Sequence, residues 1–595
     1  MFVSKELIKG GSFLIDKIEP EQVFTPEDFS DEQKMIYKMA KDFVEGEVVP
    51  KLEELEKQEE GLAKDLVKKA GELGLVGADI EEKYEGTETD KISSFLVNEI
   101  FAKGGSFALT FGAHTGIGTL PIIYYGTEEQ KQRYLPDLAS GEKMAAYALT
   151  EPGAGSDAMN IKTRAVLSDD GENYILNGSK QWITNGGWAD VYVVFAKIDG
   201  EKYSAFIVER DWEGVSTGEE EEKMGIKGSS TRTINFDDVK VPKENLLFDE
   251  GKGHQVAFNV LDLGRYKLGI GCLGSSKEAL RESIKYSMER EQFKTPIYKF
   301  PMIMEKIAKM TSKIYATESM LYRIAGDIEA SLNQIDKESE NVGKEASKRI
   351  GDYAIECSLA KIYASEMLDW VVDEGVQVHG GYGFSAEYPI ERMYRDSRIN
   401  RIFEGTNEVN RMIMPATLMR KAQKGELPVM GAAQKLQKEL VLPIEPPEKN
   451  EFPYPEIKLL ENAKKICLMV SGTAVEKFGE KLRDQQEILT RVSNLMIEIY
   501  MIESALLRAI KTGKKDKDKG ELMAALTKLY INDTWPEFVK NAKESLKATE
   551  EGDNLATMLA ALKKLSNYEE DNIVKLQRGI AKKVYEVKDY PFPYQ

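Results

Sequence analysis

The hydrophobic positions of the first part of the chain follow a helical period. Ser30 is followed three residues later by Gln33, a pairing typical of a helix N-terminus. Apolar side chains then recur at the spacing of one helix face. A proline and a glycine in "YLPDLASGEK" end the region. The pattern predicts an N-terminal α-helical domain over residues 30–143.

After Met144 the pattern changes to short β segments. "NYILNG", "VYVVFAKIDGEKYSAFIVER" and "TRTINFDDVKVP" are rich in β-branched and aromatic residues. They are bounded by Asn-Gly and Asp-Gly dipeptides, which are strong signals for hairpin turns. We therefore expect a middle domain over residues 144–245 that forms a compact antiparallel β-barrel.

Helical periodicity then returns in long segments. "PMIMEKIAKMTSKIYATESMLYRIAGDIEAS" and "GDYAIECSLAKIYASEMLDWVVDEG" are long enough for bundle helices, which predicts a C-terminal four-helix bundle over residues 250–424. The Pro-rich "VLPIEPPEKNEFPYPEI" follows, which no helix can cross. Residues 456–588, interrupted by the charged loop "KTGKKDKDKG", predict an additional C-terminal α-helical domain. The expected fold class is mainly α and multidomain, with a central antiparallel β-barrel.

Composition excludes several function classes. The chain has 595 residues, too many for one core, and its net charge of −19 argues against nucleic-acid binding. No apolar run approaches the ~18 residues that span a bilayer, and the N-terminus lacks a secretory or transit pattern. Three separated cysteines are typical of a reducing compartment. We expect a cytoplasmic protein, with peripheral membrane contact as an alternative.

The sequence offers little for metal or hydrolytic chemistry. It has three histidines, no HxxxH or CxxC spacing and no G-x-S-x-G, so we expect no metal site and no serine hydrolase. "GIGCLG" (residues 269–274) matches a dinucleotide-binding spacing, but the preceding residues are helical, so close helix packing explains it better. A carboxylate and a bound cofactor are therefore expected. In "RIFEGTNEVNR", Glu404 is either a surface charge or a base held in a dry place.

Two segments of the β region favour a flat aromatic cofactor. "EPGAGSD" (residues 151–157) has glycines that let the backbone approach a ligand and a serine that can bind phosphate, although a plain turn is the alternative. In "QWITNG", Trp182 and Thr184 stand two residues apart on one face of a strand. A buried tryptophan is the alternative there.

The order of several motifs carries more weight. "LTEPGAGSD", "QWITNGG", "LDLGR", "EREQF", "VQVHGGYGF", "YPIERMYRDSRI" and "IFEGTNEVNR" follow one another along the chain. On these motifs, residues 30–420 resemble the acyl-CoA dehydrogenase family. The C-terminal extension and "YKFPMIMEKIAKM" are similar to its very-long-chain branch, and the lack of an organelle presequence favours a bacterial long-chain member.

The resemblance implies roles for individual residues. Glu404 is the implied catalytic base, with Asp262 as the alternative. Implied substrate contacts are Ser156, Asp262, Arg265 and Gly405. FAD is expected between barrel and bundle. Two groups of contacts, Arg290 to Phe293 and Gln377 to Gly381, would come from a neighbouring subunit. The implied FAD contacts are Tyr147, Leu149, Thr150, Ser156, Trp182, Ile183, Thr184, Arg290, Gln292, Phe293, Gln377, Gly380, Gly381, Thr406, Asn407 and Glu408.

The implied reaction is FAD-dependent α,β-dehydrogenation of long-chain fatty acyl-CoA to trans-2-enoyl-CoA, the first step of fatty acid β-oxidation. An electron-transferring flavoprotein would accept the electrons, and the chain would be a homo-oligomer, with a dimer favoured. Small residues in "GSFALTFGAHTGIG" (residues 105–118) predict a deep pocket for chains of about C14 to C18. The alternatives are an acyl-CoA oxidase that uses oxygen and a membrane-associated assembly or scaffold protein on the same fold.

Overall fold

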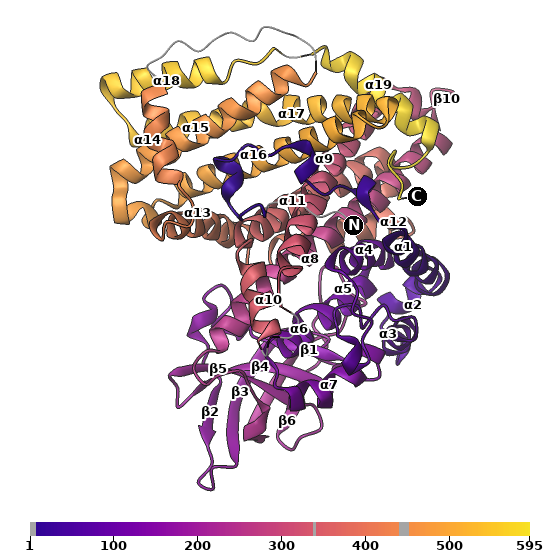
Figure 1. Cartoon of the computed structure of the whole chain (residues 1–595). Coiled ribbons are helices and arrows are strands. Elements are labelled where there is room, and N and C mark those ends of the chain that lie inside the picture. Colours follow the sequence, from indigo (N-terminus) through magenta and orange to yellow (C-terminus); the bar gives the residue numbers. More distant parts are fainter. Residues whose placement is uncertain (1–6, 337–338, 340, 440–451, 570, 595) are drawn as a thin grey trace.

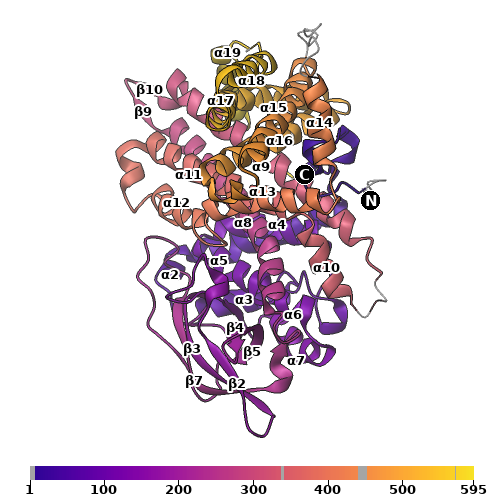
Figure 2. The same ribbon diagram turned by 90° about the vertical axis from the view of Figure 1, so that its left-hand side faces the viewer.

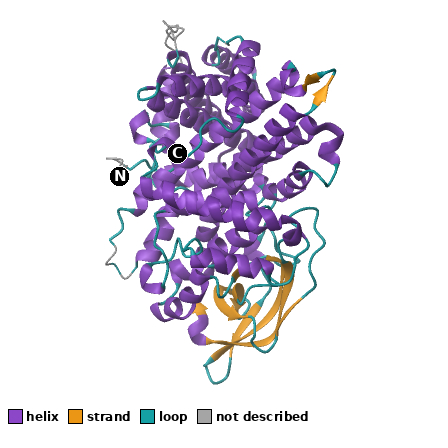
Figure 3. Ribbon diagram, turned by 90° about the vertical axis from the view of Figure 1, so that its right-hand side faces the viewer, coloured by secondary structure: helices purple, strands orange, loops and turns teal. Residues whose placement is uncertain are grey.

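The structure, a computed structural model, describes residues 7–336, 339, 341–439, 452–569 and 571–594. Nearly all strands gather at one end of the molecule and helices build the rest (Figures 1 and 3). The C-terminal helices lie at the end opposite the sheet, with the long central helices between them (Figure 2). Over these described ranges, no helix combines the length and the apolar character that crossing a bilayer requires.

Short helices form the N-terminal part, as the periodicity predicted. The first begins where expected, because the Ser30 hydroxyl accepts a hydrogen bond from the backbone N–H of Gln33 at 3.2 Å. The seven α-helices here are α1 (Asp31–Phe43), α2 (Leu52–Glu56), α3 (Leu62–Glu72), α4 (Lys91–Phe101), α5 (Ser106–Ala113), α6 (Leu120–Tyr125) and α7 (Glu128–Ser140).

The middle part is an open, mixed sheet. Its strand order is β6-β7-β3-β2-β4-β5-β8, with β1 beside β4. The predicted closed barrel is wrong: among the described strands, β6 and β8 end the path and do not pair with each other. The antiparallel prediction is also incomplete, since β1 and β2 both run parallel to β4. The strands are β1 (Ala145–Ala148), β2 (Arg164–Leu167), β3 (Asn173–Thr184), β4 (Val191–Ile198), β5 (Lys202–Glu209), β6 (Val215–Thr217), β7 (Thr231–Pro242) and β8 (Leu246–Leu247).

The two dipeptides expected to turn behave differently. Asp199 and Gly200 join β4 to β5 in a hairpin, as predicted. Asn177 and Gly178 lie inside β3, so the turn predicted there is wrong. A Cβ on Gly178 would stand 2.5 Å from the Thr163 hydroxyl. The glycine therefore serves the close approach of a neighbouring segment rather than a chain reversal.

A long helix organises the bundle. α8 (Gly253–Glu289) has 37 residues and packs on α4, α9 and α11. "GIGCLG" lies inside it, as expected of a packing motif: a Cβ on Gly274 would stand 2.1 Å from the carbonyl oxygen of Glu99 on α4. The other bundle helices are α9 (Pro301–Leu332), α10 (Val342–Gly351), α11 (Ala354–His379), α12 (Pro389–Ser397) and α13 (Asn407–Gln423), and a small hairpin pairs β9 (Glu291–Gln292) with β10 (Thr295–Pro296).

The C-terminal helices pack on α9 and α13 (Figure 1). Residues 441–451 of the predicted Pro-rich linker lie outside the described residues. The helix after it begins at Tyr454, inside the predicted linker, with Pro455 in its first turn, where proline is tolerated. These helices are α14 (Val429–Glu439), α15 (Tyr454–Phe478), α16 (Gln486–Gly513), α17 (Lys517–Thr549), α18 (Gly552–Leu565) and α19 (Ile573–Val587).

Candidate active site

A strained loop carries the predicted base. Glu404 and Gly405 precede α13 with φ of 59° and 79°, so two consecutive residues are left-handed and one of them is not glycine. Side chains hold the carbonyl groups of this loop. Asn410 donates to the Gly405 carbonyl at 2.8 Å, Lys361 donates to the same oxygen at 2.8 Å, and the Arg265 Nε donates to the Glu404 carbonyl at 3.3 Å. The loop is thereby fixed although its backbone is unfavourable.

The Glu404 carboxylate has an unsatisfied oxygen. Its Oε2 is buried and has no hydrogen-bond partner in the described part of the chain. It lies against Gly264 of α8, where a Cβ would stand 3.0 Å from Oε2, so glycine makes room for the acid. Burial raises the pKa of Glu404 to about 7, although Arg265 and Lys361 oppose the rise. Glu404 is therefore a stronger base than a glutamate in water.

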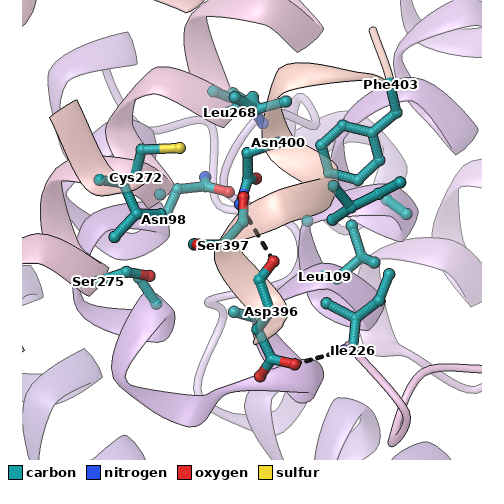
Figure 4. Close-up of a pocket in the computed structure, with 18 of the residues that line it drawn as sticks. Asn98, Leu109, Ile226, Leu268, Cys272, Ser275, Asp396, Ser397, Asn400 and Phe403 are labelled. Atoms are coloured by element: carbon teal, nitrogen blue, oxygen red, sulfur yellow. Dashed lines mark hydrogen bonds between the residues drawn. The ribbon is translucent and has the colours of Figure 1, made fainter. Parts of the chain in front are cut away.

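A cavity starts at Glu404 and follows α8. One face of this helix lines it at a spacing of three or four residues, from Gly264 to Glu278. Fourteen residues of helix span about 21 Å. Figure 4 shows Phe403 and Leu109 on one side of this cavity and Asn98, Cys272 and Ser275 on the other. The α8 face consists of Gly264, Lys267, Leu268, Gly271, Cys272, Ser275 and Glu278, and α5 contributes Ala108, Leu109, Gly112 and Ala113.

The structure brings the two predicted β segments together. The Gln181 N–H donates to the Thr150 carbonyl at 2.9 Å, and Thr184 lines the cavity. The predicted regular alternation is wrong, because a β-bulge lies between Lys180 and Ile183 and Trp182 is left-handed with φ 58°. The indole of Trp182 is consequently 60% exposed.

Open space lies in front of the glycine-rich segment. No atom of the described residues lies within 4 Å of a Cβ built on Gly153 or Gly155, and Ser156 is exposed. The predicted contacts Tyr147, Leu149 and Ile183 are buried. The backbone at the two glycines is therefore accessible to a ligand.

A second cavity gathers another group of predicted residues. Arg290, Gln292, Gly380 and Gly381 line it together with His379, whose ring stacks on Tyr286 at 4.2 Å between centroids. The side chain of Phe293 is 91% exposed, and Gln377 is exposed too. The described linings of the two cavities have no residue in common. The predicted FAD contacts thus fall into two separate groups within one chain.

Some predicted site residues are engaged inside the bundle. Asn407 is buried, and its amide group bonds to Lys361, Ser365 and Glu366. The Thr406 hydroxyl accepts the Val409 N–H and so caps α13. Glu408 is exposed on the first turn of the same helix.

Asp262, the alternative base, is buried and paired. The Arg265 guanidinium donates to it at 2.6 Å. Burial raises the pKa of Asp262 to about 6, and Arg265 opposes the rise. Asp262 is absent from the described lining of the Glu404 cavity. The geometry therefore favours Glu404 over Asp262.

Two residues of the loop support were not predicted. Lys361 is fully buried on α11, and Asn410 is fully buried on α13. A signal for Lys361 existed, because a lysine inside the apolar helical segment "CSLAKIYASEML" is rarely buried without a partner. Asn410 stands in "FEGTNEVNR", where its position relative to the loop could not be read from the sequence.

Comparison with known proteins decides the family. Residues 30–142 match the acyl-CoA dehydrogenase N-terminal domain, residues 146–239 its middle domain and residues 251–419 its C-terminal domain. Residues 462–564 match a further domain, also described as an acyl-CoA dehydrogenase C-terminal domain. A probable acyl-CoA dehydrogenase of Bacillus subtilis (strain 168) is 51% identical over 584 residues, which cover 98% of both chains.

The chain belongs to the acyl-CoA dehydrogenase family. Members of this family are flavin-dependent oxidoreductases. A crystal structure of an acyl-CoA dehydrogenase complexed with FAD from Bacillus anthracis aligns with a TM-score of 0.95 and 53% identity, covering 98% of this chain and 100% of the other. The very long-chain specific acyl-CoA dehydrogenase, mitochondrial, of Macaca fascicularis is 40% identical over 375 residues, which cover 61% of this chain and 54% of that protein. The family resemblance predicted from the motifs is confirmed.

Proposed function

We propose that the chain uses FAD to dehydrogenate long-chain acyl-CoA between the α and β carbons, giving trans-2-enoyl-CoA. One observation carries the proposal: a Glu404 carboxylate oxygen, which no described residue bonds, lies beside a cavity that follows α8 for about 21 Å. A buried acid without a hydrogen-bond partner lowers the stability of the fold, but it is free to accept a proton from a substrate. Membership of a flavin-dependent family supports the same reaction.

The residues around the cavity fit a flavin. The space before Gly153 and Gly155 and the exposed indole of Trp182 leave room for a flat ring system with phosphates attached. Thr150, Ser156 and Thr184 are the proposed polar contacts. When bound, FAD supplies the acceptor for the hydride that leaves the β carbon.

Glu404 is proposed to take the proton from the α carbon. Its pKa of about 7 narrows the gap to the weakly acidic C–H group, and exclusion of water by the acyl chain would raise its basicity further. The Glu404 backbone N–H is the proposed donor to the thioester oxygen, where negative charge develops as the proton leaves. Gly405 lets the substrate approach this loop, and Asp262 and Arg265 remain proposed contacts of the CoA moiety.

The depth of the cavity supports a long acyl chain. In an extended acyl chain each carbon–carbon bond of about 1.5 Å adds less than 1.5 Å to the length of the chain. The part of the cavity that follows α8 for about 21 Å is therefore long enough for more than about fourteen carbon atoms. The wall opposite α8 is built from Ala108, Gly112 and Ala113, which leave this depth free. A preference for about C14 to C18 follows.

The separation of the two groups of predicted FAD contacts supports an oligomer. Each flavin would contact the residues around Trp182 and Thr184 in one subunit. In the neighbouring subunit it would contact the residues that line the second cavity, among them Arg290. We propose a homodimer in which the C-terminal helices cover the face of the bundle formed by α9 and α13. We propose an electron-transferring flavoprotein as the electron acceptor.

Anaerobic titration tests the proposal. The holoprotein is mixed with saturated acyl-CoAs from C4 to C20 and the visible flavin absorbance is followed. We expect loss of the absorbance, with the second-order rate constant of flavin reduction greatest at C14 to C18. Failure of every acyl-CoA to reduce the flavin would reject the function. Air is then admitted to one sample and an electron-transferring flavoprotein to another; reoxidation that is fast in air would instead support the oxidase.

A further inference from the structure

The segment that follows α19 returns to the centre of the molecule. Residues 589–594 extend from the left-handed Lys588, which ends α19, toward α4, α8 and α9. Tyr590 and Phe592 are buried, and Tyr594 is half-buried. Figures 1 and 2 show the C label beside the junction between the N-terminal helices and the C-terminal ones. We call this stretch the 589–594 segment.

The Tyr594 hydroxyl joins three helices. It lies 2.9 Å from a Glu99 oxygen on α4 and 2.7 Å from a Glu318 oxygen on α9. Lys277 of α8 donates to it at 2.6 Å, and the Lys277 ammonium also lies 4.3 Å from the centre of its ring. The ring meets Phe29 edge-on at 5.0 Å. A single side chain therefore contacts four separate parts of the fold.

We call the cavity that starts at Glu404 the acyl cavity, and its far end is the part beside Ser275 and Glu278. The contacts of Tyr594 lie behind this far end. Glu99 is the neighbour in sequence of Asn98, which lines the cavity, and Lys277 stands between the lining residues Ser275 and Glu278. The two helices touch where Gly274 meets the Glu99 carbonyl. Because adjacent residues of a helix point in different directions, one face of α4 and α8 forms the cavity wall and another face carries the charged cluster.

Lys277 depends on its neighbours for its place. It donates to Glu99 at 2.6 Å and to Glu318 at 2.5 Å as well as to Tyr594. All three of its hydrogens are thereby used. Removal of the Tyr594 hydroxyl would leave one donor of Lys277 without its acceptor in a buried site, so α8 would shift relative to α4 to find another.

Tyr590 provides a natural contrast. Its hydroxyl donates to Glu318 at 2.7 Å, so it belongs to the same segment and the same cluster. This hydrogen bond reaches α9, and toward α8 Tyr590 presents its ring, whose centre lies 4.9 Å from the Lys277 ammonium and which a phenylalanine would keep. Tyr590 therefore reports what loss of one buried hydroxyl does to the cluster without a direct change at the cavity wall.

We propose that Tyr594 is a positioning residue for the far wall of the acyl cavity, so that the 589–594 segment tunes the use of long acyl chains. The inference rests on the proposed dehydrogenation. Short acyl chains do not reach the wall formed by Asn98, Ser275 and Glu278. Acyl chains long enough to follow α8 to the end of the cavity contact this wall.

The test compares Tyr594→Phe with Tyr590→Phe, each as full-length holoprotein. For Tyr594→Phe we expect KM for C16 acyl-CoA to rise roughly threefold to tenfold, the effect of one buried hydrogen bond. We expect kcat for C16, and both constants for C4, to stay at the wild-type level. Tyr590→Phe should leave the ratio of C16 to C4 activity unchanged. A chain that stops after Pro593 is a second variant and should change the same ratio by more.

Flavin content and thermal unfolding are measured for every variant. Equal losses for C4 and C16 would overturn the proposal, as would an unchanged C16 KM or an equal effect of Tyr590→Phe. Loss of folding in both Tyr594→Phe and the shortened chain would also overturn it, because the segment would then be a general stabiliser. A wild-type protein that no acyl-CoA reduces would instead reject the proposed function, which keeps the two failures distinct.

Discussion

Glu404 and Glu318 are two glutamates covered by the same bundle, yet their surroundings are opposite. Glu318 is fully buried on α9 and receives Lys277, Arg508 and the hydroxyls of Tyr590 and Tyr594 at 2.5 to 2.7 Å. Burial alone would raise its pKa, but Lys277 and Arg508 bring the pKa of Glu318 below its ordinary value. Glu404 has an oxygen that finds no partner in the part of the chain that the structure describes, and burial raises its pKa to about 7.

The difference teaches how the same side chain serves two purposes. A buried carboxylate surrounded by cations and hydroxyls stays ionised and joins elements. One that faces a cavity without such partners holds its proton at a pH near neutrality and can exchange it. Burial is common to both, so the partners decide the chemistry.

The largest effect is expected from Glu404→Gln. The amide keeps the shape of the side chain but cannot accept the proton, so kcat should fall by about 10²- to 10⁴-fold. Rapid anaerobic reduction of the flavin by C16 acyl-CoA measures the loss. Asp262→Asn is the control, and it should retain more activity. A Glu404→Gln variant that reduces its flavin at the wild-type rate would break the comparison.

Arg508→Met should lower stability strongly. Arg508 is fully buried and pairs with Glu318 at 2.5 Å and with Glu27 at 2.8 Å. Removing one partner of a buried pair typically costs about 3–5 kcal/mol. Urea unfolding followed by circular dichroism gives the shift. The matched control is Arg491→Met, whose pair with Glu544 is partly open to solvent and should contribute far less. Equal shifts would show that burial is irrelevant here.

Gly112→Glu should fill part of the cavity from its α5 wall. In the described structure the nearest atom to a Cβ on Gly112 is the Asn98 Oδ1 at 3.7 Å, so a larger side chain enters open space. We expect kcat/KM to fall at least about tenfold for C16, since two buried methylenes already account for about 1.6 kcal/mol. The C4 value should change much less. Gly112→Ala is the control, and an equal loss for both lengths would contradict an open cavity.

The pH profile tests the same carboxylate without any substitution, and near pH 7 its effect is the smallest of the four. Glu404 accepts a proton only when ionised, and its folded pKa of about 7 lies above the usual value. Activity is therefore lost as the pH falls: kcat/KM should drop about tenfold per unit below pH 7 and level off above it. Flavin absorbance without substrate controls for loss of cofactor. If kcat/KM is already constant from pH 5 upward, the pKa of Glu404 is not raised, and Glu404 behaves like the paired carboxylates.

Local patterns predicted much of the fold. The capping pair at Ser30 and the helical nature of "GIGCLG" depend on neighbours in sequence, and the structure confirms both. Local rules failed where a distant segment decides. Asn177 and Gly178 have the chemistry of a turn, but packing against Thr163 keeps them within a strand. Closure of the sheet likewise depends on edges that no single strand reveals.

The same limit applies to the site. Motif order singled out Glu404 and the segments around Thr150 and Thr184, and in the structure Glu404 and Thr184 line one cavity. The sequence could not assign Lys361, because its carbonyl acceptor lies 44 residues away in the chain. Nor could it pair Glu27 with Arg508 across 481 residues. Such pairs depend on the completed fold, whereas a motif describes only what lies next to itself.

The separation of the two cavities has a consequence for how the protein is handled. If each flavin is held jointly by two chains, retention of the flavin obeys the law of mass action. Dilution would release cofactor and separate subunits together, and added FAD would favour reassociation. Specific activity would then fall with decreasing enzyme concentration, and assays at nanomolar protein would report the assembly equilibrium as much as the catalyst.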